Sequence, residues 1–360
     1  MTGDIMSGLI EGLPDAVALH CLARVPFYYH QNLRLVCRSW RAALCSPEVF
    51  KARREAGTSE ELLCVLAFHP ENIWQLYDPC RDHWLTLPVM PSQIRHLARF
   101  GVTSVDGKLF VLGGGSDRVD PLTGDHDGIF ATSEVWSYDP FYHEWSRRAN
   151  MLVPRAMFAC CSLDGKIVVA GGFTSFRKSI SKAEIYDPDT DSWRSLPDLR
   201  HTHTSASFGV VIDGKIHVLH KGLSAVQILD DGQQWRVVDF GWLQGPMAVV
   251  RDELYVLNGG FILKQRKGSS QKEKDDNTLV DKLVSSSPEF RSRIGFGMIG
   301  LGDDLYVIGG VIGPGPTNQL IKQLRDVDVL SVNTKWPIWR QASPMTRCSG
   351  SILGCAVLKI

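Results

Sequence analysis

The 360-residue chain contains no apolar run of 18 residues, so no segment has the length and composition of a membrane-spanning helix. It has nine cysteines but no Cys-x-x-Cys pair, no Asn-x-Ser/Thr acceptor and no apolar leader at its start, which favours free thiols in a reducing compartment over secretion. Lysine plus arginine equals aspartate plus glutamate at 39 each, so no global basic field attracts nucleic acid or anionic lipid. We therefore expect a soluble cytoplasmic or nuclear protein, or one found in both compartments, with neither nucleic acid nor membrane as a partner.

A Tyr-Asp-Pro phrase followed by tryptophan recurs along the chain. Proline cannot donate to a strand ladder and aspartate favours a turn, so the phrase closes one strand and tryptophan opens the next. In three clear copies tryptophan lies six positions after aspartate, and in a fourth copy it lies five positions after. The copies are Tyr77-Asp78-Pro79 with Trp84, Tyr138-Asp139-Pro140 with Trp145, Tyr186-Asp187-Pro188 with Trp193, and Leu229-Asp230 with Trp235.

An Asp-Gly-Lys turn and a β-rich run ending in Gly-Gly precede most of these phrases. Asp-Gly supplies the positive φ angles of a two-residue hairpin, and Gly-Gly removes side chains where backbones crowd together. The whole unit recurs at roughly 40 to 50 residues, the period of propeller blades, which must stack in a ring to bury both faces. The turns are Asp106-Gly107-Lys108, Asp164-Gly165-Lys166 and Asp213-Gly214-Lys215, with variants Arg251-Asp252-Glu253 and Gly302-Asp303-Asp304.

The first unit lacks its first strand. Residues 62–88 offer three strands, and the apolar segment 352–358 at the end of the chain has no neighbour in sequence to pair with. We expect this segment to supply the missing strand. Five whole units plus this split one predict an all-β, six-bladed propeller over residues 61–360, with its first blade closed by the C-terminal strand.

The fifth unit departs from the pattern, because residues 262–290 contain neither Tyr-Asp-Pro nor tryptophan. Residues 279–284 are a poor substitute for the expected strands. The segment is either a long loop or degenerate blade, or, over residues 264–289, an artefact of the gene model. Its basic run Lys264-Gln265-Arg266-Lys267 is also a candidate nuclear-import signal.

Residues 1–60 have helical rather than β periodicity. Asp15 can cap a run that Pro26 ends, residues 32–45 are helix-compatible, and Ser46-Pro47-Glu48 begins another helix that Gly57 ends. About 45 residues of short helices are too few to stabilise a core alone, so this unit needs the ring or a partner to cover its apolar faces. A helical cap on the propeller is one interpretation.

The helical segment resembles the F-box, at matching spacings, in Leu13-Pro14-Asp15, Leu22, Val25-Pro26 and residues 35–41. The repeats resemble kelch repeats, and nearly the entire chain resembles the plant F-box/kelch-repeat proteins of the Skp-interacting type. The resemblance implies an all-α F-box domain over residues 1–60. By resemblance, the adaptor-binding face comprises Leu13, Pro14, Leu22 and Val25, with Val36 and Trp40 packing against it or extending it. Cys21 stands where the motif usually has isoleucine.

This resemblance implies the substrate-recognition subunit of an SCF-type E3 ubiquitin ligase. In such a complex the F-box binds a Skp adaptor, and through it a cullin/RING core, while the propeller captures a target protein for ubiquitination and degradation. The implied protein is a non-catalytic adaptor without a cofactor. A non-ligase kelch scaffold is the alternative, and a kelch enzyme is a third reading for which no paired nucleophile and base is evident.

A target would bind at loops on one face of the ring. Arg99 and Met157 lie 14 residues before the first glycine of their Gly-Gly pairs, and Arg293 precedes its own by 16. By resemblance to kelch proteins that bind acidic peptides, these residues and those after Gly-Gly line the mouth. Arginine suits an acidic or phosphorylated segment, although the same residues could instead brace adjacent blades. The candidate rim residues are Arg99, Arg155, Met157, Phe173, Arg200, His203, Phe261, Arg293 and Arg347, with Val311 and His201 beside them.

Three other patterns are discounted. The histidines at 201, 203, 217 and 220 lack aspartate or cysteine partners at ligand spacing, so no metal site is expected. Gly113-Gly114-Gly115 lacks the Gly-Lys-Ser/Thr that completes a P-loop. The acidic stretch 117–127 lacks the ligand order of a calcium loop and is interpreted as a solvated insertion.

Overall fold

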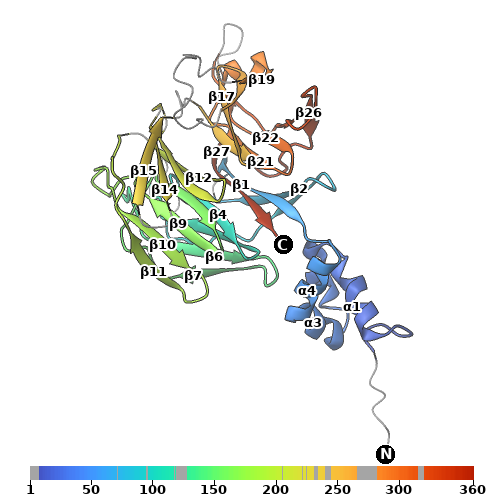
Figure 1. Cartoon of the computed structure of the whole chain (residues 1–360). Coiled ribbons are helices and arrows are strands. Elements are labelled where there is room, and N and C mark those ends of the chain that lie inside the picture. The colour runs from blue at the N-terminus through green and yellow to red at the C-terminus, as the bar shows by residue number, and fades with distance from the viewer. Residues whose placement is uncertain are drawn as a thin grey trace, which may run out of the picture.

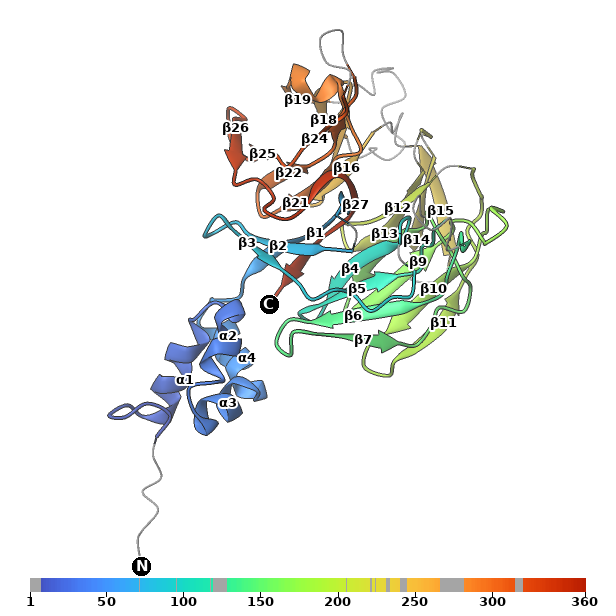
Figure 2. The ribbon, with the colours of Figure 1, turned by 180° about the vertical axis from the view of Figure 1, so that it is seen from behind.

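The computed structural model describes residues 8–70, 72–94, 96–116, 118, 128–204, 206–220, 222–223, 225–230, 234–239, 245–265, 282–314 and 320–360. A small helical unit projects from one side of a ring of β-sheets, and the C-terminus lies between the two (Figures 1 and 2). Within the described ranges, no helix is both long and apolar enough to cross a membrane.

Short helices pack around one small core in the N-terminal unit. Leu22 of the first helix packs with Leu44, Val49 and Ala52 from the last two. The elements are α1 (Asp15–Ala23), η1 (Phe27–Tyr29), α2 (His30–Leu33), α3 (Arg38–Leu44) and α4 (Pro47–Glu55).

Two local expectations for this unit were wrong. Asp15 is the first residue of α1 rather than its cap, and its Oδ1 accepts a hydrogen bond from the Leu9 N–H at 2.7 Å. The stretch 32–45 is not one helix, because α2 ends at Leu33 and α3 begins at Arg38. Cys37 caps α3, its Sγ accepting from the Trp40 N–H at 3.4 Å.

The described residues of the ring form six four-stranded antiparallel sheets, which we number as blades 1 to 6. From the innermost strand outward, blade 1 is β27 (Ser349–Lys359), β1 (Glu61–His69), β2 (Trp74–Asp78) and β3 (His83–Thr86); blade 2 is β4 (Gly101–Val105), β5 (Lys108–Leu112), β6 (Val135–Asp139) and β7 (Glu144–Arg148); blade 3 is β8 (Ala159–Leu163), β9 (Lys166–Ala170), β10 (Ala183–Asp187) and β11 (Ser192–Leu196).

Blade 4 is β12 (Ser207–Ile212), β13 (Lys215–His220), β14 (Ala225–Asp230) and β15 (Gln234–Asp239); blade 5 is β16 (Met247–Val250), β17 (Glu253–Asn258), β18 (Phe261–Lys264) and β19 (Lys282–Ser286); blade 6 is β21 (Gly297–Leu301), β22 (Asp304–Ile308), β25 (Val327–Ser331) and β26 (Trp339–Ala342). Between blades 5 and 6 lie η2 (Pro288–Arg291) and β20 (Arg293–Ile294), and β20 forms a small sheet with β23 (Val311–Ile312) and β24 (Lys322–Gln323).

The innermost strands contact one another in the closed succession β27, β4, β8, β12, β16, β21 and back to β27. The C-terminal strand β27 pairs with β1 from Glu61↔Lys359 to His69↔Ser349, so it supplies the innermost strand of blade 1. Glycine lets these strands approach closely. A Cβ on Gly354 would lie 2.5 Å from the Phe100 ring, and one on Gly300 would lie 2.1 Å from the Val249 carbonyl oxygen.

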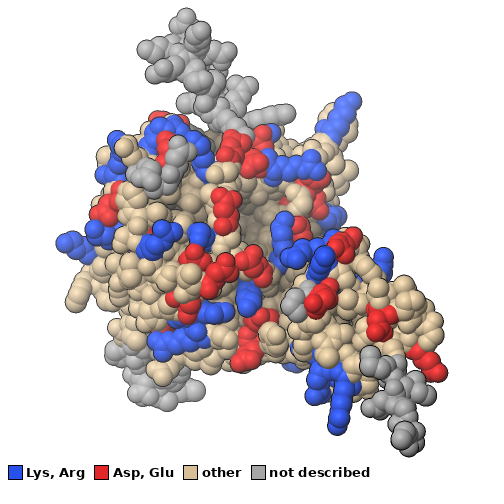
Figure 3. Space-filling view, turned by 60° about the horizontal axis from the view of Figure 1, so that its bottom comes forward, with Lys and Arg blue, Asp and Glu red and all other residues tan. Residues whose placement is uncertain are grey.

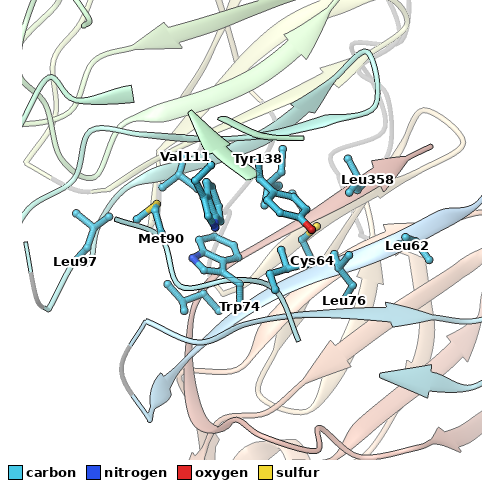
Figure 4. Packing of buried hydrophobic residues seen from close by; sticks show 14 of the residues in the cluster. Leu62, Cys64, Trp74, Leu76, Met90, Leu97, Val111, Tyr138 and Leu358 are labelled. Carbon is cyan, nitrogen blue, oxygen red and sulfur yellow. The ribbon is translucent and has the colours of Figure 1, made fainter. Parts of the chain in front are cut away.

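Tryptophans join the outer strands of five blades to the preceding blade. The Trp145 indole N–H donates to the Pro88 carbonyl at 2.8 Å, and Trp84 donates to Ser343 at 2.7 Å, which links blade 1 back to blade 6. Trp193, Trp235 and Trp339 make equivalent bonds to Ala149, Pro197 and Ser285. Large side chains fill the spaces between blades. Trp74 of β2 and Tyr138 of β6 point into one cluster between blades 1 and 2 (Figure 4).

The two repeated phrases of a blade are joined by an ion pair. The lysine of Asp-Gly-Lys contacts the aspartate of Tyr-Asp-Pro: Lys108 with Asp139 at 3.1 Å, and Lys215 with the equivalent Asp230 at 2.9 Å. Such surface pairs contribute about 0 to 1 kcal/mol each. They connect two turns that lie at the same end of the blade because its strands alternate in direction.

Blade 5 has its third and fourth strands despite lacking the usual phrase. Gly259-Gly260 forms the turn between β17 and β18, and a Cβ on Gly260 would lie 2.7 Å from the Ser287 carbonyl oxygen. Strand β18 then pairs with β19. The fourth strand, residues 282–286, includes residues 282–284 of the segment considered as a substitute, and residues 266–281 lie outside the described ranges. No tryptophan occurs between residues 245 and 290, so blade 5 lacks an indole bond to blade 4.

We expect Trp145→Phe to lower the free energy of unfolding by about 2 kcal/mol, because the Pro88 carbonyl loses its donor and part of the ring volume is lost. Urea unfolding followed by circular dichroism measures this change. Trp336→Phe is the matched control, since Trp336 is 74% exposed and should tolerate the change. Equal stabilities for the two variants would contradict the role of the indole bond.

Candidate functional site

The outer surface of the helical unit exposes large apolar side chains. Leu35 and Val36, in the turn between α2 and α3, are 75% and 61% exposed, and Leu13 and Val17 at the start of α1 are also exposed. Trp40 ties α3 to the segment before α1 by donating its indole N–H to the Leu9 carbonyl. Exposed apolar side chains of this size are typical of a contact with another protein when they form one patch.

The six residues expected to bind an adaptor divide into three groups. Leu13, Pro14 and Val36 are exposed, whereas Val25 and Trp40 are half-buried. Leu22 is only 2% exposed and packs inside the helical unit, so its assignment to the adaptor face was wrong. Leu22 matches the F-box spacing, and its side chain forms part of the core of the helical unit.

Other residues of the helical unit are docked on blades 1 and 2. Phe50 packs edge-on against Phe141, in the turn between β6 and β7, with ring centroids 4.0 Å apart. Phe27 is buried in the cluster between the two blades, and the Tyr28 hydroxyl donates to Asp78 Oδ2 at 3.2 Å. Arg34 donates to the Phe141 carbonyl. This surface of the helices is therefore already covered by the ring.

Arg53 holds the connection between the two parts. It is buried, donates to the carbonyls of Ala23 (3.0 Å) and Val25 (2.9 Å), and forms an ion pair with Glu60. Backbone hydrogen bonds join Glu60 to Ile360 in both directions, at 3.1 and 2.9 Å. The Arg53 contacts and the Glu60–Ile360 hydrogen bonds together hold the helical unit at one position on the ring.

The candidate rim residues lie at the end of the ring opposite the helical unit. The helices contact the turn between β6 and β7 and the end of β2, which is the end where the first and third strands of each blade finish. In an antiparallel blade, the connections from second to third strand and from each fourth strand to the next blade lie at the other end. All nine candidates lie on these connections or at their borders. The end that carries the helices shows interspersed positive and negative side chains (Figure 3).

Arg155 is a bracing residue rather than a rim residue. It is fully buried, donates to the carbonyls of Gly171 and Lys182 at 2.9 Å each, and forms an ion pair with Glu184. Burial lowers the pKa of Arg155, and Glu184 opposes that shift. Its assignment to the rim was therefore wrong.

Arg293 has the same role in blade 6. It is buried, donates to the Gly309 and Asp326 carbonyls, and pairs with Asp328. Both Arg155 and Arg293 lie 16 residues before the first glycine of Gly-Gly. The position 14 residues before it is occupied by Gly295, and Gly295, Arg99 and Met157 share a φ between 56° and 68°. Arg293 is therefore equivalent to Arg155 and not to Arg99, and the expected grouping of Arg293 with Arg99 was wrong.

The remaining candidates form local groups on the rim. Arg99 lies 4.9 Å from the Phe130 ring and Arg177 lies 4.7 Å from it, while Met157 and the buried Phe173 belong to the same apolar cluster. Sequence reasoning missed Phe130, which carries no repeat signal. The other rim candidates include exposed Arg200, Arg347 and Phe261, half-buried His203 packed on His220, and half-buried Val311.

A buried polar residue on the third strand was also missed. Gln75 Oε1 accepts from the backbone N–H groups of Arg347 and Cys348 at 3.0 and 3.1 Å, and Gln227 Oε1 accepts from that of His201 at 3.1 Å. Glu184 and Asp328 occupy the equivalent position on their own third strands. In each case the polar residue lies two positions before the tyrosine or leucine of the repeated phrase. In the sequence, this position could have been found as a polar residue between apolar residues of the third strand. These side chains fix the loops from which Arg200 and Arg347 project.

The histidines of blade 4 make hydrogen bonds within the fold. The two ring nitrogens of buried His220 lie 3.1 Å from Ser207 Oγ and Gln227 Nε2, and burial lowers its pKa to about 4. In the described part of the chain, no group of histidine, cysteine, aspartate or glutamate side chains is arranged to hold a metal ion. Most of the acidic stretch 117–127 lies outside the described residues.

Comparisons with known families agree with both parts of the fold. The F-box domain model matches residues 10–52, and the Kelch motif model matches residues 154–200. The chain is 58% identical over 358 residues to F-box/kelch-repeat protein SKIP30 of Arabidopsis thaliana, covering 99% of each chain. It is 30% identical over 379 residues to F-box/kelch-repeat protein At1g16250 of the same organism, covering 99% and 98%.

A solved structure supports the fold alone. The structure of YjhT aligns with a TM-score of 0.55 at 14% sequence identity, covering 78% of this chain and 94% of that one.

We expect Arg155→Met to destabilise the protein by about 3 to 5 kcal/mol, because it leaves the Glu184 carboxylate buried without its partner. Arg200→Met removes an exposed guanidinium and should leave the melting temperature unchanged. Calorimetry of both variants measures the difference. A stable Arg155→Met protein would contradict the bracing role.

Stability should fall on acidification from pH 7 to pH 5. Burial, together with nearby positive charge, lowers the pKa of His30 and His220 to about 4, below the unfolded value of about 6.5. The unfolded chain therefore binds more protons in this window. The stabilisation is complete above pH 6.5 and is lost toward pH 4, by about 2 kcal/mol per histidine at pH 5. Urea unfolding across this range measures the slope. His220→Asn should reduce this slope by about one proton, and a slope equal to that of the parent chain would contradict the assignment.

Proposed function

Because this chain belongs to the F-box/kelch-repeat family, we propose that it is the substrate-recognition subunit of an SCF-type E3 ubiquitin ligase. Its F-box binds a Skp adaptor and through it the cullin/RING core. Its propeller captures a target protein for ubiquitination and degradation. The protein itself acts without catalysis, as a connector between the target and the ubiquitin-loading enzyme.

The observation that supports this proposal is that large apolar side chains of the F-box stay exposed although the ring covers other parts of it. The ring covers Phe27 and Phe50 of the F-box, the latter through Phe141, whereas Leu13 and Val36 of the F-box remain exposed. A cap that served only the propeller would not need an exposed apolar surface of its own. The exposed side chains instead fit a partner that covers them.

The rigid connection also suits a ligase. Ubiquitin transfer requires the target's lysine to approach the loaded enzyme, and a fixed spacing raises the effective concentration of one relative to the other. Arg53, Glu60 and the Phe50–Phe141 contact hold the F-box at one position on the ring. A target bound on the far rim is thereby presented at a defined distance from the adaptor.

The alternative is a kelch scaffold that binds a protein without a ligase core. The two proposals differ in one measurable property, which is binding of a Skp adaptor through residues 13–36. Retention of a target by the propeller would be common to both.

We expect the double variant Leu13→Ala, Pro14→Ala to lose about 2 kcal/mol or more of adaptor binding free energy, because these exposed apolar groups would become buried in the contact. Isothermal titration with a purified Skp adaptor measures the loss. Leu152→Ala removes an exposed leucine from the ring and serves as the matched control. Unchanged affinity of the double variant, or absence of adaptor binding by the parent chain, would favour the scaffold.

A further inference from the structure

A cavity of about 480 Å³ opens at the end of the ring that carries the F-box. Its lining includes Asp106 and Gly107, which follow β4, and Lys359, at the end of β27. The cavity has the size of sites that take small molecules or single side chains. Most of its wall is aliphatic, and the aliphatic residues of the innermost strands are Val102, Val210, Val249, Ile299 and Val357.

A tight turn follows the innermost strand in each of blades 2 to 6, and these turns lie around the opening. Neighbouring turns contact one another: the Asp213 N–H donates to Asp252 Oδ1 at 3.1 Å, and Arg251 forms an ion pair with Asp303. Figure 3 shows this end of the ring, where acidic side chains lie beside the central hollow. We call the turn aspartates the aspartate collar; they are Asp106, Asp164, Asp213, Asp252 and Asp303, and all but Asp303 are exposed.

Carboxylates predominate in the aspartate collar. The lysines of three of these turns form ion pairs two strands farther out, with aspartates at the ends of third strands: Lys108 with Asp139, Lys166 with Asp187, and Lys215 with Asp230. Of the other cations described beside the opening, Arg251 pairs with Asp303, and Lys359 pairs with Glu61 at 2.6 Å. An aliphatic cavity with carboxylates around its opening is complementary to an apolar side chain that has basic residues on either side.

We propose that this cavity and the aspartate collar bind a basic segment of a partner protein. One aliphatic side chain of the segment enters the cavity, and lysine or arginine residues on either side of it contact the collar. Burial of the aliphatic side chain contributes affinity in proportion to its area, whereas the carboxylates select for positive charge. The inference goes beyond the proposed function, which places target capture at the opposite end of the ring.

The test uses the full chain and fluorescein-labelled peptides of the form Lys-Arg-X-Arg-Lys, with X as leucine or alanine. Fluorescence anisotropy should show about tenfold tighter binding of the leucine peptide, as expected when such a side chain is buried. A peptide with leucine between glycine and serine residues should bind more weakly than the basic leucine peptide. That difference should shrink in high salt, because salt screens exposed charges.

Asparagine substitutions test the role of the collar. Asp106, Asp164 and Asp252 have φ angles of 47°, 49° and 61°, which asparagine adopts more readily than most residues, so the turns should be retained. The triple variant Asp106→Asn, Asp164→Asn, Asp252→Asn should bind the basic leucine peptide about tenfold more weakly, because several exposed charge pairs are lost. Asp189→Asn is the matched control, since Asp189 is exposed at the same end, in the turn between β10 and β11 outside the collar.

A charge inside the cavity tests the role of the aliphatic wall. Ser162 is half-buried and belongs to the cavity lining. Ser162→Lys places an ammonium group where the aliphatic side chain of the segment would lie, so it should remove the preference for leucine over alanine. Melting curves verify that this variant and the triple variant fold.

Four results would overturn the proposal. Absence of binding by the basic peptides, or equal binding by the triple variant and the parent chain, would exclude the collar as a site for basic segments. Equal binding of the leucine and alanine peptides would show that the cavity takes no side chain. Self-association of the chain that Ser162→Lys abolishes would assign this surface to a second copy. Adaptor titration on the same preparations tests the ligase role separately, because Leu13 and Pro14 are unchanged in all of these variants.

Discussion

Contact between successive blades is the constraint on which the rest of the structure depends. A four-stranded sheet has two apolar faces, and each is covered only when a neighbouring blade lies against it. The outer tryptophan of five blades donates to the preceding blade, and glycines such as Gly354 let the innermost strands converge. These contacts hold the loops of the rim in place. They also give the F-box a firm surface on which to dock.

Much of the fold followed from sequence because each repeated phrase meets a local backbone requirement. Asp106 and Gly107 have φ angles of 47° and 73°, as the predicted hairpin requires, and the fold class is confirmed. The F-box/kelch-repeat resemblance is likewise confirmed by relatives that match nearly the whole chain. Blade 5 was harder to predict, since β19 lies far along the chain from β18 and has no phrase of its own.

The site was less predictable because residue type alone does not determine burial. Arg155 and Arg200 both follow the outer strand of a blade, yet one is fully buried on Glu184 and the other is exposed. The difference comes from a partner on another strand, which spacing along one strand does not reveal. Leu22 is a second example: its position in the motif was recognised, but its side chain is buried in the small helical core. The target-binding rim remains a prediction from position and charge.

The pairing of β27 with β1 has a consequence for synthesis. The apolar strand β1 is made before the other strands of the ring, but its partner β27 follows all five other blades, and Glu61 is paired with Lys359. Until then β1 keeps an open edge of the kind that joins other strands in aggregates. The nascent ring therefore depends on late closure, and a chain that stops before residue 349 would have a complete F-box attached to a ring that cannot close. Blade 1 therefore reaches its four-stranded form only after the strands of every other blade have been made.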